Sequence, residues 1–258
     1  MIAVDKLSKA YGAQTVVADV SIRFPARRLT SLIGPNGAGK TTLLMMIARL
    51  LKPTAGEILI DGRRVSEISI GDYARRVATL RQSPDFSLRL TVEELVAFGR
   101  FPHSRGVLTA ADQRAIDAAI AFLSLEPLRQ SYIDELSGGQ RQMAFLAMTI
   151  AQQTPCLLLD EPLNNLDIRH AVQIMRALRR LCDEHDRTVI LVVHDINFAA
   201  NYSDHIVAMK RGVVHCAGPV CDVVTEERLL ELYGLDFEIT HSERGRLCNY
   251  FNPLGELQ

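Results

Sequence analysis

The chain has no excess of charge of either sign. Its 258 residues include 29 Lys and Arg and 30 Asp and Glu, which gives a net charge of −1. Proteins that bind nucleic acids usually carry a surplus of basic residues. The balance therefore argues against a general nucleic-acid binder, although it leaves room for a local basic patch, and we expect no nucleic-acid partner.

Long hydrophobic runs are also lacking. The longest apolar runs, 188–193 and 156–159, are much shorter than the roughly 20 residues that span a bilayer. The N-terminal stretch MIAVDKLSKAYG interrupts its apolar residues with Asp5, Lys6 and Lys9, unlike a secretory signal peptide. We expect a chain that is neither exported nor inserted into a membrane by its own sequence.

Cysteine is scarce. The five cysteines are odd in number and form no CxxC pair, which fits a reducing cytoplasm better than a disulfide framework. A metal site that uses Cys216 and Cys221 stays open as an alternative, but their spacing favours ordinary thiols. The sequence has no internal repeat or low-complexity tract either, and its length allows one large domain or two small ones.

What the sequence does contain is an alternation of strand and helix patterns typical of an α/β protein. Apolar alternation and turn residues predict strands over 16–24, 29–34, 156–161 and 188–194, and hairpins over 56–65 and 205–218. Helical spacing predicts a mainly helical region over 86–153, including a helix over 109–125, and a further helix over 168–185. Thr91 and Glu94 resemble a capping box at a helix start within this region.

A phosphate-binding loop follows one of these strands. Residues 34–41, GPNGAGKT, match GxxxxGK[ST] in full between a predicted strand and a predicted helix. The glycines would let backbone N–H groups close around phosphates, Lys40 would reach the β- and γ-phosphates, and the Thr41 hydroxyl could hold Mg²⁺. A plain glycine-rich turn is the alternative, which the complete motif in this context disfavours.

Polar residues end three further strands. Asp160 and Glu161 end the strand in CLLLDEP, where Asp160 could hold Mg²⁺ and Glu161 could polarise an attacking water. His194 and Gln82 each end another strand. Because ligands bind outside the carboxyl ends of the strands in open α/β sheets, these residues and the loop predict one shared site. Solvated acids and a structural histidine remain the alternatives for each residue alone.

A second glycine-rich turn, LSGGQRQ at 136–142, precedes a predicted helix but contains no lysine. Backbone N–H groups at a helix N-terminus can hold an anion. Ser137 and Gln140 also fit a capping box, which alone would explain both residues as structure and is compatible with a function.

Taken in order and spacing, the loop at 34–41, Gln82, LSGGQ, LLLDEP, NNLD and His194 resemble an ATP-binding cassette (ABC) ATPase over roughly 1–224. The resemblance implies an α/β fold with a P-loop NTPase core, a RecA-like mixed sheet, an N-terminal antiparallel β subdomain and an inserted α-helical subdomain. The implied parts of this single ABC domain are 1–85 for the β subdomain and P-loop, 86–153 for the helices with LSGGQ, and 154–258 for the rest of the core.

In that family two cassettes pack head to tail, and each ATP lies between the P-loop of one copy and the LSGGQ turn of the other. The resemblance therefore implies an ATP site in each copy formed by Tyr11, Gly34, Pro35, Asn36, Gly37, Ala38, Gly39, Lys40, Thr41 and Thr42. The partner copy would add Ser137, Gly138, Gly139 and Gln140. Tyr11 would stack on adenine, with a surface aromatic as the alternative.

The resemblance also gives roles to the residues around the phosphates. Glu161 would be the general base, His194 the γ-phosphate sensor, and Asp167 would lie in a loop that crosses the dimer interface. Gln82 would contact metal and water and connect to the membrane partner. The implied ligands of Mg²⁺ are Thr41, Gln82 and Asp160.

Two stretches, 90–103 and 158–180, resemble the cassettes of bacterial importers for iron–siderophore, haem and vitamin B12, and most of all the iron–siderophore members. This implies a homodimer on the cytoplasmic face of the membrane, with two integral-membrane permease subunits and, indirectly, an exported substrate-binding protein. The segment 86–105 would receive the permease, or is a plain amphipathic insert. Met143 departs from the family, in which many members carry Arg.

Two rival functions stay open at this stage. One is an importer cassette for haem, vitamin B12 or, less in keeping with the sequence, an amino acid or a sugar. The other is a soluble ABC protein that acts on ribosomes or DNA, although such proteins usually carry two fused cassettes or long insertions, which this chain lacks.

Overall fold

The computed structural model of the protein describes residues 1–81, 89–243 and 245–251, which form parts of two compact units. The first unit consists of Met1–Glu67 and Ile190–Gln258, and the second of Ile68–Val189. The predicted division into 1–85, 86–153 and 154–258 stays a prediction.

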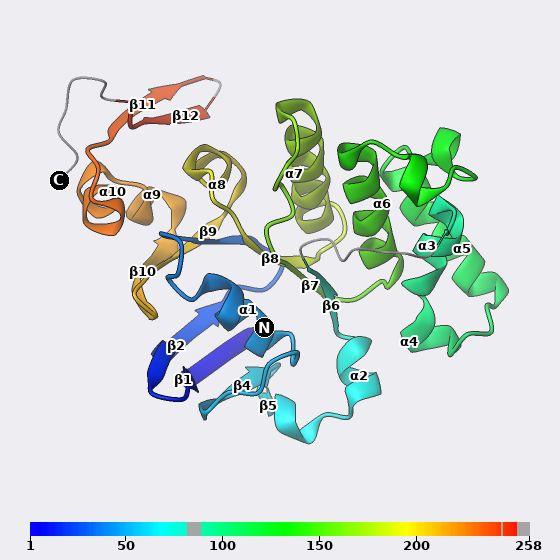
Figure 1. Ribbon diagram of the computed structural model, residues 1–258, viewed down its shortest axis with the longest axis horizontal. Coiled ribbons are helices and arrows are strands. Elements are labelled where there is room, and N and C mark those ends of the chain that lie inside the picture. The colour runs from blue at the N-terminus through cyan, green and yellow to red at the C-terminus, as the bar shows by residue number, and fades with distance from the viewer. Residues whose placement is uncertain (82–88, 244, 252–258) are drawn as a thin grey trace. The chain divides into compact units, whose positions relative to one another are not determined.

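The first unit contains most of the strands (Figure 1). Its N-terminal elements are β1 (Ile2–Tyr11), β2 (Gln14–Phe24), β3 (Leu29–Ile33), α1 (Lys40–Ile47), β4 (Ala55–Ile60) and β5 (Arg63–Arg64). Its later elements are β8 (Thr188–Val192, which begins in the second unit), α8 (Ile196–Tyr202), β9 (His205–Lys210), β10 (Val213–Pro219), α9 (Val220–Val223), α10 (Glu226–Tyr233), β11 (Glu238–Ser242) and β12 (Gly245–Asn249).

Two larger sheets organise the described part of this unit. Strands β2, β1, β4 and β5 form an antiparallel sheet in that order, and β10, β9, β3 and β8 follow one another in a second, mixed sheet in which β3 and β9 run parallel. Every residue of β3 and of β8 is buried, as expected for central strands covered on both faces. The P-loop therefore starts from a strand that is buried along its whole length.

A C-terminal hairpin, β11 with β12, is attached to α8 through two asparagine side chains. Asn197 accepts from the Cys248 N–H at 2.8 Å and donates to the Cys248 carbonyl, and Asn201 makes the same pair of bonds with Arg246. One helical turn spaces the asparagines by about 6 Å, and two strand residues span about 6.8 Å, so the two repeats match. The side chains of α8 thus replace a neighbouring strand.

The second unit is mainly helical. Its elements are α2 (Ile70–Ala74), β6 (Val77–Leu80), α3 (Val92–Phe98), α4 (Phe101–Ser104), α5 (Ala110–Phe122), α6 (Gly138–Ala151), β7 (Cys156–Leu159) and α7 (Ile168–Asp183). Helices α3, α5 and α6 pack against one another (Figure 1), and β6 pairs in parallel with β7. The predicted capping box of Thr91 and Glu94 is confirmed at the start of α3.

A buried ion pair connects the three packed helices. The Arg100 guanidinium, just after α3, donates to Asp112 of α5 at 2.8 Å and to the Ala151 carbonyl at the end of α6 at 2.7 Å. Hydrogen bonds from the Thr109 hydroxyl and backbone, and then from Arg100, hold the pKa of Asp112 down at about 2. The carboxylate is therefore ionised at neutral pH, and it orients the guanidinium toward the end of α6.

Helices α3 and α6 approach closely at Gly99. A Cβ atom on this residue would lie 2.0 Å from the Met148 carbonyl oxygen. We expect Gly99→Ala to lower the free energy of unfolding by about 1–3 kcal/mol, because the two helices must move apart. Urea unfolding measures this change. Gly71→Ala in α2 is the matched control, since no atom lies within 4 Å of its Cβ position, and a loss of the same size there would contradict the explanation.

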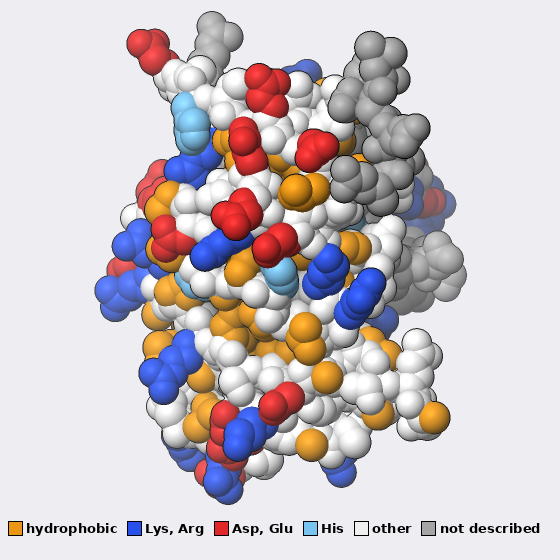
Figure 2. Space-filling view, turned by 90° about the vertical axis from the view of Figure 1, so that its left-hand side faces the viewer, with side chains coloured by type: hydrophobic (Ala, Val, Ile, Leu, Met, Phe, Trp, Pro, Cys, Tyr) orange, Lys and Arg blue, Asp and Glu red, His pale blue; other side chains and the backbone are white. Residues whose placement is uncertain are grey.

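The fold class predicted from the sequence is confirmed, with a mixed sheet, an antiparallel β sheet and a helical part. After α10, the strands β11 and β12 pair antiparallel as a hairpin. Within the described ranges, no helix is long and apolar enough to cross a membrane, and no group of three His, Cys, Asp or Glu could hold a metal ion. Acidic and basic side chains are interspersed on the face shown in Figure 2.

Candidate functional site

The loop between β3 and α1 has a backbone that only glycine allows at two positions. Gly34 and Gly39 have φ of 135° and 94°. A Cβ on Gly34 would lie 2.0 Å from the Met209 carbonyl oxygen, and one on Gly39 would lie 2.8 Å from the Val16 carbonyl oxygen. The loop is thus pressed against β9 and β2, and its open side is lined by backbone, which suits close contact with phosphates.

Lys40 is the first residue of α1 and is buried. Its ammonium group folds back over the loop and donates to the Gly34 carbonyl at 2.7 Å and the Pro35 carbonyl at 2.9 Å. The N-cap of α1 is Gly39, whose lack of a side chain leaves the positive end of the helix facing the loop. A positive side chain and a helix N-terminus converge here, so the loop can hold an anion.

The remaining residues of the predicted nucleotide loop follow the same course. Asn36 and Gly37 are exposed, Ala38 is buried, and Thr41 and Thr42 lie in the first turn of α1 with Thr41 exposed. The Ala38 carbonyl accepts from the Gly212 N–H at 3.1 Å, so the turn between β9 and β10 supports the loop from behind. The Thr41 side chain thus lies at the surface of this first turn.

His194 lies beside the strand that leads into the loop. Val193 donates its N–H to the Leu32 carbonyl of β3 at 3.2 Å, and His194 follows as an exposed residue. The next residue, Asp195, caps α8 by accepting from the Asn197 N–H at 2.7 Å. The strand on one side and the cap on the other fix the backbone of His194.

Tyr11 ends β1, with about half of its surface exposed at 53%. The Lys9 ammonium lies 5.0 Å from the centre of its ring. The adjacent strand β2 carries Val16, whose carbonyl oxygen lies against Gly39. Strand β2 therefore contacts both β1, which carries Tyr11, and the P-loop at Gly39. The exposed ring of Tyr11 lies at the end of β1.

Asp160 and Glu161 follow β7 in the second unit. Asp160 is buried, and its N–H donates to the Leu80 carbonyl of β6 at 2.9 Å. Glu161 is half-buried and has a φ of 51°, a left-handed conformation that is unusual for a residue other than glycine. The Asn164 amide donates to the Glu161 carboxylate. Backbone strain at a held carboxylate is typical of a functional site.

The LSGGQ turn forms the start of α6. Gln140 donates its N–H to the Ser137 hydroxyl at 3.3 Å, and the Ser137 N–H donates to the Gln140 amide oxygen at 3.0 Å, so the predicted capping box is confirmed. Ser137 and Gly138 are exposed, and Gly139 is buried. Two of the helix N–H groups are thus bound by the chain's own side chains.

Comparison with known proteins gives the family. The ABC transporter family model matches residues 17–164. The chain belongs to the ABC transporter family. It is 44% identical over 252 residues to the petrobactin import ATP-binding protein YclP of Bacillus subtilis, covering 98% of this chain and all of the relative. The petrobactin import ATP-binding protein FatE of Bacillus anthracis is 46% identical over 250 residues, covering 97% of this chain and all of FatE.

Solved structures of ABC cassettes share this fold. A bacterial ABC transporter cassette, solved as a dimer, superposes with a TM-score of 0.76 at 28% identity, covering 85% of this chain and 99% of the cassette. The resemblance predicted from the sequence is therefore confirmed, and the chain is an ATP-binding, ATP-hydrolysing ABC protein.

The structure brings some of the predicted residues of this ABC protein together within a unit. In the first unit, adjacent strands carry the P-loop and His194. In the second unit, β7 leads into Asp160 and Glu161, and Asp167 caps α7 by accepting from the His170 N–H at 2.8 Å. That bond is the main reason why the pKa of Asp167 is lowered. Gln82 lies outside the described residues.

Sequence reasoning missed two residues near the site. Asn164 holds Glu161, and its signal was the pair of asparagines in EPLNN, which was used only as part of a family motif. The His170 ring lies against Gly139, although the two residues are far apart in the sequence. Only the fold reveals this contact.

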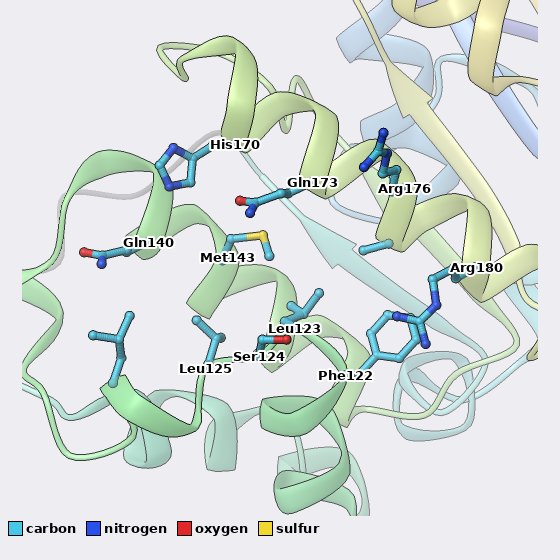
Figure 3. Close-up of a pocket in the computed structure, with 12 residues that line it drawn as sticks. Phe122, Leu123, Ser124, Leu125, Gln140, Met143, His170, Gln173, Arg176 and Arg180 are labelled. Carbon is cyan, nitrogen blue, oxygen red and sulfur yellow. The ribbon is translucent and has the colours of Figure 1, made fainter. Parts of the chain in front are cut away.

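A cavity of about 430 Å³ opens beside this contact, between α6, α7 and the end of α5 (Figure 3). Gln140 and Met143 point into it from α6, and His170 and Gln173 come from α7. Met143, the departure from the family pattern, is buried in this wall and does not enter the capping box.

Proposed function

We propose that this chain is the ATPase subunit of a bacterial importer that takes up iron–siderophore complexes. The supporting observation is that relatives named for petrobactin import are 44% and 46% identical and match nearly the whole chain. A further relative, 36% identical, is named a probable siderophore transport system ATP-binding protein, which is the class of cargo predicted from the sequence. The chain acts on ATP, while the cargo passes through separate membrane proteins.

Two copies would form the working unit, packed head to tail. The LSGGQ turn has a helix N-terminus but no lysine, whereas the P-loop has a helix N-terminus and Lys40. The LSGGQ turn of one copy would therefore bind a phosphate together with the P-loop of the other copy. The similar cassette solved as a dimer supports a dimeric arrangement. In this arrangement Ser137, Gly138, Gly139 and Gln140 contact the γ-phosphate that Lys40 of the partner holds.

Nucleotide binding within one copy begins at the P-loop. The backbone amides of the loop and the Lys40 ammonium bind the phosphates, and Lys40 exchanges its present carbonyl partners for phosphate oxygens. Tyr11 offers its exposed ring to adenine. Each of these groups binds ATP before the dimer closes.

Mg²⁺ is proposed as the cofactor, because the residues fit a hard cation. The hydroxyl of Thr41 and the carboxylate of Asp160 are oxygen ligands, and Gln82 is the third predicted ligand. Bound Mg²⁺ would neutralise phosphate charge during the transfer. The burial of Asp160 at a strand end keeps its carboxylate in a fixed place.

Hydrolysis is assigned to Glu161 and His194. Glu161 accepts a proton from the attacking water, and the Asn164 amide orients its carboxylate for this step. His194 projects from a backbone fixed by β8 and by the Asp195 cap, so its ring can bind the γ-phosphate as the sensor.

The membrane partners would dock on the helical part of the second unit. Phe98 and Phe101 expose 53% and 62% of their surface on α3 and α4, within the predicted docking segment 86–105. Exposed aromatic side chains of this kind are typical of protein interfaces. We propose that two permease subunits contact this surface at the cytoplasmic face of the membrane, and that an exported binding protein delivers the cargo to them.

Uptake by the reconstituted transporter tests this function. Proteoliposomes that contain this chain, its permease and the binding protein are expected to accumulate ferric petrobactin only with ATP on the cassette side. Lys40→Ala, which removes the phosphate-binding ammonium, is the control without energy supply. If the proteoliposomes accumulate haem or vitamin B12 and not the ferric chelate, the proposed cargo is wrong. If they accumulate none of these compounds with ATP, the result favours a soluble ABC protein.

A further inference from the structure

The backbone conformation of Gly139 does not require glycine, but its surroundings do. It lies in the first turn of α6, and it is not among the residues with positive φ. A Cβ atom there would lie 2.3 Å from Cγ, 2.5 Å from Cδ2 and 2.6 Å from Nδ1 of His170. By contrast, no atom lies within 4 Å of the Cβ position of Gly138. The His170 ring occupies the space that a side chain at position 139 needs.

The ring of His170 is held in this place from its other side. Its Nδ1 lies 2.9 Å from both carboxylate oxygens of Asp167, and its backbone N–H donates to the same carboxylate at 2.8 Å. Because a carboxylate only accepts, Nδ1 carries the proton. The side chain of His170 is 25% exposed, against 64% for Asp167, so the ring lies between the exposed carboxylate and the buried glycine.

Figure 3 shows the consequence for the two helices. His170 extends from the first turn of α7 toward the first turn of α6, and Gln140 and Met143 of α6 face the cavity beside it. The ring thus joins two helix N-termini, one capped by Asp167 and the other by Ser137. The imidazole is therefore the side chain through which the Asp167 carboxylate and the LSGGQ turn are in contact.

We infer that His170 is a positioning residue for ATP hydrolysis, which fixes the LSGGQ turn relative to the Asp167 loop and thereby aims the turn at the γ-phosphate of the partner copy. This inference rests on the proposed function, in which both segments face the partner. Gly139 is then required by the chain's own histidine, and Gly138 by the approach of phosphate alone.

A suppressor experiment tests the contact. Gly139→Ala is expected to lower kcat by about 10- to 100-fold while ATP binding at the P-loop is unchanged, because the methyl group displaces the ring and the turn with it. Adding His170→Ala should restore kcat of Gly139→Ala to that of His170→Ala alone, since the methyl group then has space. Adding His170→Ala to Gly138→Ala should restore nothing.

A conservative variant separates positioning from packing. Asparagine can keep the hydrogen bond to Asp167 with a smaller side chain, so His170→Asn should retain more of kcat than His170→Ala, with equal KM for ATP. Thermal melting of each variant shows that it is folded. Equal kcat for the two variants, or a Gly139→Ala defect that His170→Ala does not relieve, would overturn the inference.

The ATP-dependent dimer distinguishes this result from a failure of the proposed function. In a Glu161→Gln background, gel filtration with ATP is expected to show a dimer for the parent chain and a weaker dimer for Gly139→Ala, which His170→Ala restores. If the parent forms no dimer, the shared site and this inference both fall. If the parent dimerises and Gly139→Ala dimerises equally well, the inference alone falls.

Discussion

Replacing Glu161 with glutamine is expected to leave ATP bound while hydrolysis falls by about 10²- to 10⁴-fold, because glutamine has the shape of the carboxylate but cannot accept a proton from water. The amide can still meet Asn164, which now donates to the Glu161 carboxylate, so the local fold should persist. ATP then accumulates in the closed state, and gel filtration with ATP should show a stable dimer. Phosphate release measures the rate.

Glu184→Gln is the control for the general loss of an acid. Glu184 lies just after α7, pairs with Arg180 and is about half exposed at 51%, so its loss should leave turnover within about twofold. Hydrolysis at the parent rate by Glu161→Gln would rule out the base assignment. Asn164→Ala should give an intermediate loss, since it removes only the group that orients the carboxylate.

Changing Ser137 to arginine is expected to abolish hydrolysis while each monomer still binds ATP. The larger cationic side chain fills the turn that the proposed dimer places against the γ-phosphate, and loss of such contacts lowers rates by about 10²- to 10³-fold. The variant also loses a helix cap, at about 1 kcal/mol of stability. ATP affinity by equilibrium dialysis and turnover by phosphate release separate the two effects.

Thr91→Arg is the matched control for the lost cap. Thr91 forms the same capping box with Glu94 at the start of α3. This variant should show a similar loss of stability with turnover retained in the isolated protein. Full hydrolysis by Ser137→Arg, or by a strictly monomeric form of the parent, would contradict a site shared between two copies.

Local sequence patterns predicted much of this protein because their interactions are local. The P-loop, the two predicted capping boxes and the acids after β7 each depend on residues within a few positions of one another. The capping box at Thr109 was missed because its third residue is Asp112, whereas the usual pattern has Glu or Gln. The reciprocal hydrogen bonds are the same in this box, but a pattern restricted to Glu or Gln does not include Asp112.

Contacts between distant segments could not be predicted in this way. Nothing in LSGGQ indicates that a histidine after Asp167 lies against its second glycine. Similarly, Asn197 and Asn201 read as ordinary polar positions of a short helix until β12 is seen beside them. Both contacts depend on how whole elements pack, which no single stretch of sequence encodes.

The two asparagines of α8 also cover the backbone along one edge of a strand. An unpaired strand edge can recruit strands from other chains, which leads to aggregation. Along β12, the outward N–H and carbonyl groups of Arg246 and Cys248 are already bound by Asn201 and Asn197. A helix thereby closes this edge of the hairpin without adding a strand, and the small sheet cannot grow from that side.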